Sequence, residues 1–116
     1  MDAQIYKYVG AYAHTMKGTL IAFTLSTGKD RVRASRFAKT FYGQATSSHE
    51  GRYRYWRRGL LDDIPYNKLI RGVVIVREED ADRIIGFLRE HSAQVHVRVV
   101  ELDAEDRRAL GLSLDE

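Results

Sequence analysis

The chain has 116 residues, of which 44% are hydrophobic and 30% charged, a balance that excludes a wholly disordered protein. No apolar run approaches the roughly 20 residues that span a bilayer, and the absence of cysteine excludes disulfides and thiolate metal sites. We expect one domain over residues 1–116, located in the cytoplasm, with no membrane association, cofactor or metal ion.

The net charge of +3 is distributed unevenly along the chain. Residues 29–58 hold nine Lys or Arg against two acidic residues, whereas residues 78–116 hold eleven acidic residues against five basic ones. A concentrated positive segment raises the local concentration of anionic partners. The alternative is that the two segments are solvated surfaces that attract each other within or between subunits.

The N-terminal third predicts two strands and a helix. Residues 4–14 are rich in aromatic and β-branched residues, which indicates an extra N-terminal strand. Residues 19–25 form a nearly continuous apolar run, typical of a strand covered on both faces. Over residues 29–42 the apolar positions recur with the i, i+3, i+4, i+7 spacing of one helix face, and Gly43 ends the helix.

The middle third is polar at first and then apolar. Residues 44–51 are small and polar, which predicts a mobile loop. Residues 52–58 alternate as a strand, with Tyr53, Tyr55 and Arg57 on one side and the even-numbered residues on the other. Residues 68–76 carry the strongest strand signal of the chain and predict one central strand.

The last third predicts a second helix, a strand and a short terminal helix. Acidic residues open the helix that begins at residue 78, where the helix dipole favours them, and Ala81, Ile84, Ile85 and Leu88 form its apolar stripe. Residues 94–102 alternate as a strand. Residues 103–110 predict a short helix, and the acidic C-terminal tail that follows is expected to fray.

This order of elements predicts an α+β fold. Setting aside the first strand, the order is strand, helix, strand, strand, helix, strand. Two helices with matched apolar stripes then pack on one face of an antiparallel sheet, the ferredoxin-like βαββαβ arrangement with an extra N-terminal strand. The alternative pairs residues 4–14 with 19–25 as a leading hairpin and curls the sheet into a partial barrel.

The candidate functional site is the segment 52–58, in which four arginines interleave with three aromatic rings and no acidic residue. Arginine forks match phosphate oxygens, and the rings offer stacking faces for bases. The segment therefore favours nucleic-acid binding, with RNA or single-stranded DNA preferred to duplex. The candidate contacts are Arg52, Tyr53, Arg54, Tyr55, Trp56, Arg57 and Arg58.

The two sides of this predicted strand suit different roles. The even-numbered side, with Arg52, Arg54, Trp56 and Arg58, is the better candidate for a ligand surface. Tyr53 and Tyr55 can instead pack in the core, and the arginines can instead pair with the acidic C-terminal half.

Four basic residues near the first helix extend the candidate surface: Lys29, Arg31, Arg33 and Arg36. Lys and Arg contacts to phosphates supply much of the affinity of nucleic-acid-binding proteins, and the 44–51 loop can close over a bound strand. The alternative for these residues is a solvated helix face.

Two other classes of function stay open. A metal-independent ribonuclease could use His49, beside the hydroxyls of Ser47 and Ser48, or Tyr53 as general base, with Arg52 to stabilise the charged transition state. The spacing matches no known triad, so we expect no catalytic residue. An exposed strand at residues 4–14, with three tyrosines, can instead pair with a second subunit and make the protein a homodimeric assembly protein.

Overall fold

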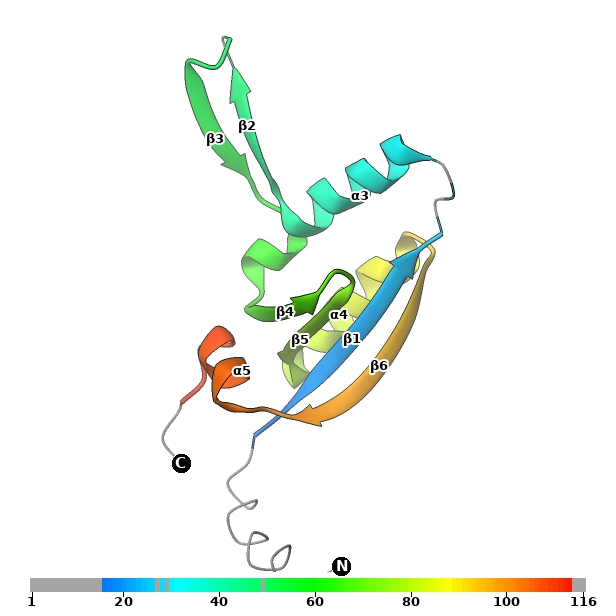
Figure 1. Cartoon of the computed structure of the whole chain (residues 1–116), viewed down its shortest axis with the longest axis vertical. Helices are drawn as coiled ribbons and strands as arrows, with labels where there is room; N and C mark the ends of the chain where they lie inside the picture. The colour runs from blue at the N-terminus through cyan, green and yellow to red at the C-terminus, as the bar shows by residue number, and fades with distance from the viewer. Residues whose placement is uncertain (1–15, 27, 29, 49, 114–116) are drawn as a thin grey trace, which may run out of the picture.

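The computed structural model describes residues 16–26, 28, 30–48 and 50–113 (Figure 1). Several sequence predictions concern residues outside this part: the strand at 4–14, Lys29, His49 and the end of the C-terminal tail.

The fold is α+β and is built on one antiparallel sheet of four strands in the order β4-β5-β1-β6. The strands are β1 (Lys17–Leu25), β4 (Tyr66–Ile70), β5 (Val73–Arg77) and β6 (Ala93–Glu101). Strand β1 lies in the middle, as its apolar run predicted, and its residues 18–22 pair with β5 on one side and β6 on the other. Residues 18–22 of β1 are therefore paired on both sides, and the alternative hairpin of residues 4–14 with residues 19–25 involves a strand that lies outside the described residues.

Three α-helices accompany the sheet in the described part: α3 (Arg31–Tyr42), α4 (Glu78–Glu90) and α5 (Ala104–Ala109). All three lie where the sequence predicted helices. Asp30 caps α3 by accepting a hydrogen bond of 2.9 Å from the backbone N–H of Arg33. Three acidic residues occupy the first turn of α4, and a capping box formed by Asp103 and Asp106 opens α5.

The main core lies between α3, α4 and one face of the sheet. The predicted stripes supply it: Phe37 and Phe41 come from α3, and Ile84 and Leu88 come from α4. Phe41 is fully buried, with its ring centroid 5.2 Å from that of Phe23 on β1 and 5.6 Å from that of Phe87 on α4. These rings join the two helices to the same face of the sheet. A smaller cluster on the opposite face packs Ile75 against Leu102 and Leu110, around α5.

Two predictions about the middle of the chain are wrong. Residues 44–48, expected in a loop, form strand β2 (Gln44–Ser48), which pairs with β3 (Tyr53–Arg57) as a separate two-stranded sheet. The single strand predicted at 68–76 is a hairpin, because the chain reverses at Arg71 and Gly72 between β4 and β5. Gly72 has φ 83°, a conformation that glycine adopts without the penalty of a Cβ.

These differences change the predicted topology. The β2–β3 hairpin lies between α3 and β4, and α5 follows β6, so the exact βαββαβ order of elements is not matched. Segment 52–58, predicted to be a strand of the main sheet, lies outside it. In the described residues, the helices are too short or too polar to cross a bilayer.

Candidate nucleic-acid interface

The β2–β3 hairpin projects from the end of α3, away from the four-stranded sheet (Figure 1). Its two strands differ in side-chain size. Ala45 pairs with Trp56, Thr46 with Tyr55 and Ser47 with Arg54. Because the partners on β2 are small, they cannot cover the large side chains of β3, and the rings and guanidiniums stand clear on both faces of the hairpin.

All five residues of β3 are exposed. The exposed fraction is 60% for Tyr53, 46% for Tyr55 and 53% for Trp56, which is unusual for aromatic side chains. The alternative, in which the two tyrosines pack in the core, is therefore wrong. Alternation along a strand implies a buried face only when a second layer packs behind that strand. The described residues place no such layer behind this hairpin.

Asp62 anchors the base of the hairpin. It lies in the short 3-10 helix η1 (Leu60–Asp63), and its Oδ2 accepts hydrogen bonds from the indole Nε1 of Trp56 at 2.6 Å and from the backbone N–H of Gly59 at 2.8 Å. These two donors stabilise the carboxylate, and they lower the pKa of Asp62, the Gly59 bond having the larger effect. Trp56 is thus held by its edge while half of its surface stays open.

Arg58 is occupied by acidic neighbours. Its guanidinium forms an ion pair with Asp63 and donates a second hydrogen bond, of 3.3 Å, to the backbone carbonyl of Asp62. Arg83 of α4 lies 3.8 Å from the other carboxylate oxygen of Asp63. Pairing with acids was the alternative considered for the arginines of segment 52–58, and it applies to Arg58, with partners in η1 instead of the C-terminal half.

The other three arginines of the segment have no acidic partner among the described residues. Arg52 lies in the turn at the tip of the hairpin, and Arg54 and Arg57 lie on opposite faces of β3. Arg57 and Thr46 make hydrogen bonds with the Tyr55 hydroxyl, which lower the pKa of Tyr55. The hairpin therefore presents guanidiniums that are available to a ligand on both of its faces.

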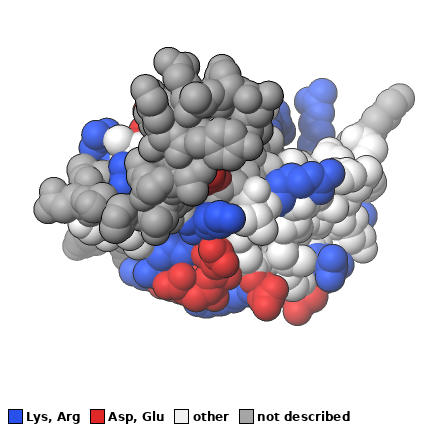
Figure 2. All heavy atoms as spheres, turned by 90° about the horizontal axis from the view of Figure 1, so that it is seen from below, with Lys and Arg blue, Asp and Glu red and all other residues white. Residues whose placement is uncertain are grey.

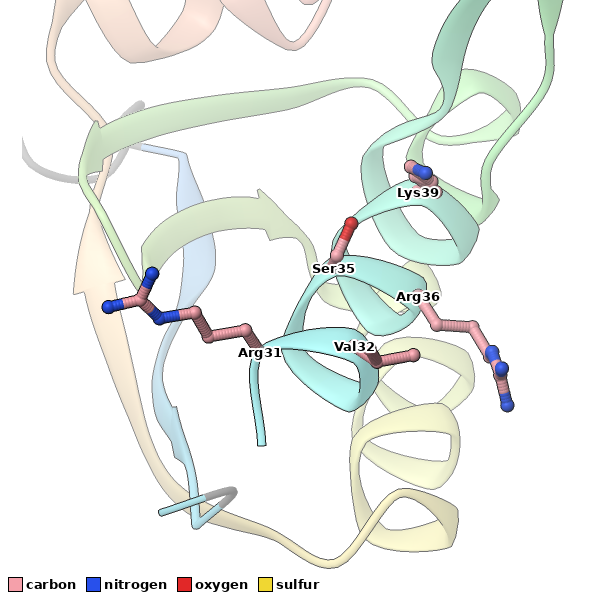
Figure 3. A pocket seen from close by; sticks show the side chains of 5 residues that line it. All are labelled: Arg31, Val32, Ser35, Arg36 and Lys39. Atoms are coloured by element: carbon pink, nitrogen blue, oxygen red, sulfur yellow. The ribbon is translucent and has the colours of Figure 1, made fainter. Parts of the chain in front are cut away.

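A second basic surface lies on α3, which leads through Gly43 directly into β2. Arg31, Ser35 and Lys39 follow one another at four-residue spacing and line an open hollow of about 510 Å³ together with Val32 and Arg36 (Figure 3). Figure 3 shows that Arg31 and Arg36 extend away from each other, so the positive charge spreads over the helix surface.

Arg33 has a different role from the other arginines of α3. Its Nη2 donates a hydrogen bond of 3.3 Å to the backbone carbonyl of His91, at the C-terminal end of α4. This contact joins the two helices, so we assign Arg33 to the packing of the domain. Lys39 belongs to the basic surface of α3 instead of Arg33. The sequence signal that identifies Lys39 is its position eight residues after Arg31, on the same side of the helix.

The acidic residues lie mainly elsewhere. Figure 2 shows the end of the molecule opposite the hairpin, where acidic side chains gather beside basic ones. The described residues from 30 to 58 contain only Asp30 and Glu50 as acids. The segment that contains α3 and the hairpin is therefore poor in acidic residues.

We define the basic surface as Arg52, Arg54 and Arg57 of the hairpin with Arg31, Arg36 and Lys39 of α3. Its guanidiniums have no acidic partner among the described residues, and on the hairpin they accompany three exposed rings; these are the groups that contact phosphates and stack on bases. Comparison with protein families, curated proteins and solved structures found no match to this chain.

Proposed function

We propose that this protein binds single-stranded nucleic acid, RNA or DNA, through the β2–β3 hairpin and the adjoining face of α3. The observation that carries the proposal is the composition of β3, where every side chain is exposed and rings alternate with arginines that lack acidic partners in the described structure. Exposed apolar side chains rimmed by polar groups often mark an interaction site.

The arginines and the rings contribute differently to binding. Contacts from Arg52, Arg54 and Arg57 to phosphates supply affinity that falls steeply with salt, because bound counterions are released. The exposed faces of Tyr53, Tyr55 and Trp56 stack on bases, worth about 1–3 kcal/mol for each base. Stacking of this kind needs bases that are not already stacked in a duplex, which is why a single strand is the favoured ligand.

We also propose that the main sheet with α3 and α4 is a ferredoxin-like core that carries the β2–β3 hairpin as an insertion. Support comes from the antiparallel order β4-β5-β1-β6 and from the common core that α3 and α4 share on one face of that sheet. In this interpretation the ligand-binding element is an addition to the core, and the face of the core sheet is not the binding surface.

A fluorescence titration tests the proposed function directly. Trp56 is the only tryptophan of the chain, so its intrinsic emission reports on the hairpin alone. We expect single-stranded RNA or DNA to quench this emission by stacking, and duplex of the same length to quench it less. The proposal is abandoned if no single-stranded oligonucleotide changes the emission or binds at low salt.

Arginine variants identify the surface. Replacing Arg52, Arg54 and Arg57 together with Ala removes three phosphate contacts, so the slope of log K against log salt falls by about 2 in magnitude for a single strand. The control is Arg89→Ala, which removes an exposed arginine of α4 outside the basic surface. If both variants weaken binding equally, the interaction is a general effect of charge and not of the hairpin.

A further inference from the structure

The two edges of the main sheet differ in how well they are protected from pairing with another chain. Strand β4, at one edge, has five residues, a register shift between Lys68 and Ile70, and a lysine. Strand β6, at the other edge, has nine residues, and all nine pair with β1 in an unbroken register. Short, irregular and charged edges resist pairing, whereas long and regular apolar edges promote it.

The register shows which main-chain groups of β6 point outward. Leu102 donates a backbone hydrogen bond of 2.8 Å to the carbonyl of Met16, which continues the pairing of Lys17 with Glu101. Even-numbered residues from 94 to 102 therefore form the hydrogen-bonded pairs with β1. In an antiparallel ladder the alternate residues turn their N–H and C=O groups away from that partner. These are Ala93, Val95, Val97, Val99 and Glu101.

A side-chain contact supports this assignment. The carbonyl of Val97 accepts a hydrogen bond of 2.7 Å from Nη1 of Arg98, the neighbouring residue on the same strand. An outward carbonyl at the middle of the edge thus takes its donor from an adjacent side chain, because no strand of the described residues lies there. Close by, Val99 is 66% exposed although it belongs to the apolar side of β6.

We propose that β6 pairs with β6 of a second copy of this chain, antiparallel about a two-fold axis at Val97. This inference does not depend on the nucleic-acid proposal. With the axis at Val97, each of the nine residues of β6 has a partner on β6 of the other copy, and Val95 of one copy lies opposite Val99 of the other. The outward main-chain groups then bond across the axis, and the exposed Val99 is covered. The two sheets become one continuous sheet of eight strands with a hairpin on each copy.

Self-complementarity is the reason to choose a second copy as the partner. Val95, Val97 and Val99 lie on one face, so the two-fold pairing brings six valines together without a charged residue among them. Valine pairs across antiparallel strands stabilise a sheet. Arg98 lies on the other face, and it leaves the Val97 carbonyl when the N–H of the second Val97 replaces it.

Cross-linking tests the register, and the absence of native cysteine makes it specific. In the proposed dimer, the cysteine of Val97→Cys in one copy lies opposite the same cysteine of the second copy in a hydrogen-bonded pair. The Cα atoms of such a pair are about 5.5 Å apart, within the range of a disulfide. We expect this variant to form a covalent dimer under mild oxidation. Val95→Cys and Val99→Cys should each form no covalent dimer alone and should cross-link to each other when mixed. Leu69→Cys, on the β4 edge, is the matched control.

The mass in solution tests the dimer itself. Light scattering of the unmodified chain should give about twice 13.3 kDa. Val99→Lys, at an exposed position, should shift the chain toward the monomer with an unchanged circular dichroism spectrum. The proposal is overturned if the unmodified chain is monomeric and Val97→Cys does not cross-link. Equal cross-linking of Leu69→Cys also overturns it, since it shows unspecific contact.

Discussion

The indole N–H of Trp56 donates a hydrogen bond of 2.6 Å to the carboxylate of Asp62, six residues further along the chain. This contact fixes an exposed ring by its polar edge and leaves the ring face open. It also ties a projecting hairpin to η1, which is packed into the core through Leu61. A two-stranded hairpin is marginally stable by itself, so this attachment matters for how the rings are presented.

Loss of the Asp62 side chain should loosen the base of the hairpin. Asp62→Ala removes the acceptor for both Trp56 and the Gly59 N–H, so we expect lower fluorescence anisotropy and red-shifted emission from Trp56. The control is Asp63→Ala, which breaks the ion pair with Arg58 and leaves the indole contact in place. Identical anisotropy in the Asp62→Ala variant and the unmodified chain would contradict this role.

The same contact should break in acid. The pKa of Asp62 is lowered from its ordinary value of 3.8, so the carboxylate stabilises the hairpin fully above that value. This stabilisation is lost as the pH falls through the lower pKa of the folded state. We expect a change in Trp56 emission with a midpoint below 3.8 that is absent from Asp62→Ala. A midpoint above 3.8 would show that another carboxyl controls the emission.

Gly59 should not tolerate a larger side chain. A Cβ at this position would lie 2.7 Å from the carbonyl of Phe41 and would overlap the backbone of Gly43. Gly59→Ala therefore forces the end of α3 and the start of η1 apart, and we expect a clear drop in the melting temperature. Gly86→Ala is a suitable comparison, because no atom lies within 4 Å of the added Cβ and alanine favours a helix. Equal melting temperatures for the two variants would refute the close approach.

Phe41 should be essential for stability and Val32 should not. Phe41→Ala removes a fully buried ring that contacts Phe23 and Phe87, which costs about 3–5 kcal/mol of unfolding free energy. Val32→Ala on the same helix, at a side chain 66% exposed, should change it by less than about 0.5 kcal/mol. Chemical denaturation measures both. A small effect at Phe41 would mean that α3 is not held by this core.

Arg58 should behave differently from its neighbours in binding. Because it is paired with Asp63, Arg58→Ala should leave the salt dependence of nucleic-acid affinity unchanged, whereas Arg54→Ala should reduce it. Titrations at several salt concentrations distinguish the two. An equal reduction in both variants would mean that Arg58 leaves Asp63 to contact phosphate.

The helices and two strands of the sheet could be predicted from the sequence because their apolar periodicity reports a buried face. The stripe of Ile84 and Leu88 identifies α4, and the alternation of residues 94–102 identifies β6 to within a residue. The β4–β5 hairpin was missed because its turn, Arg71 and Gly72, lies inside an otherwise apolar run. A glycine at that point was the available signal for a turn.

The sequence assigned the candidate site to segment 52–58, but the geometry of that segment was not predictable from the pattern. Alternation in segment 52–58 indicates a strand, and it says nothing about whether another layer covers that strand. Only the structure shows that Tyr55 and Trp56 are both exposed, on opposite faces of a hairpin. The separation of Arg58 from the other arginines depends on Asp63, whose position in η1 no periodicity reveals.

The close approach of Gly43 and Gly59 means that the chain enters and leaves the hairpin at a single point. Residues 44–58 are therefore a self-contained cassette: joining the two glycines directly would remove it while α3 and β4 keep their places. A different arm could be spliced at the same junction. The core is in this sense independent of the segment that joins the two glycines.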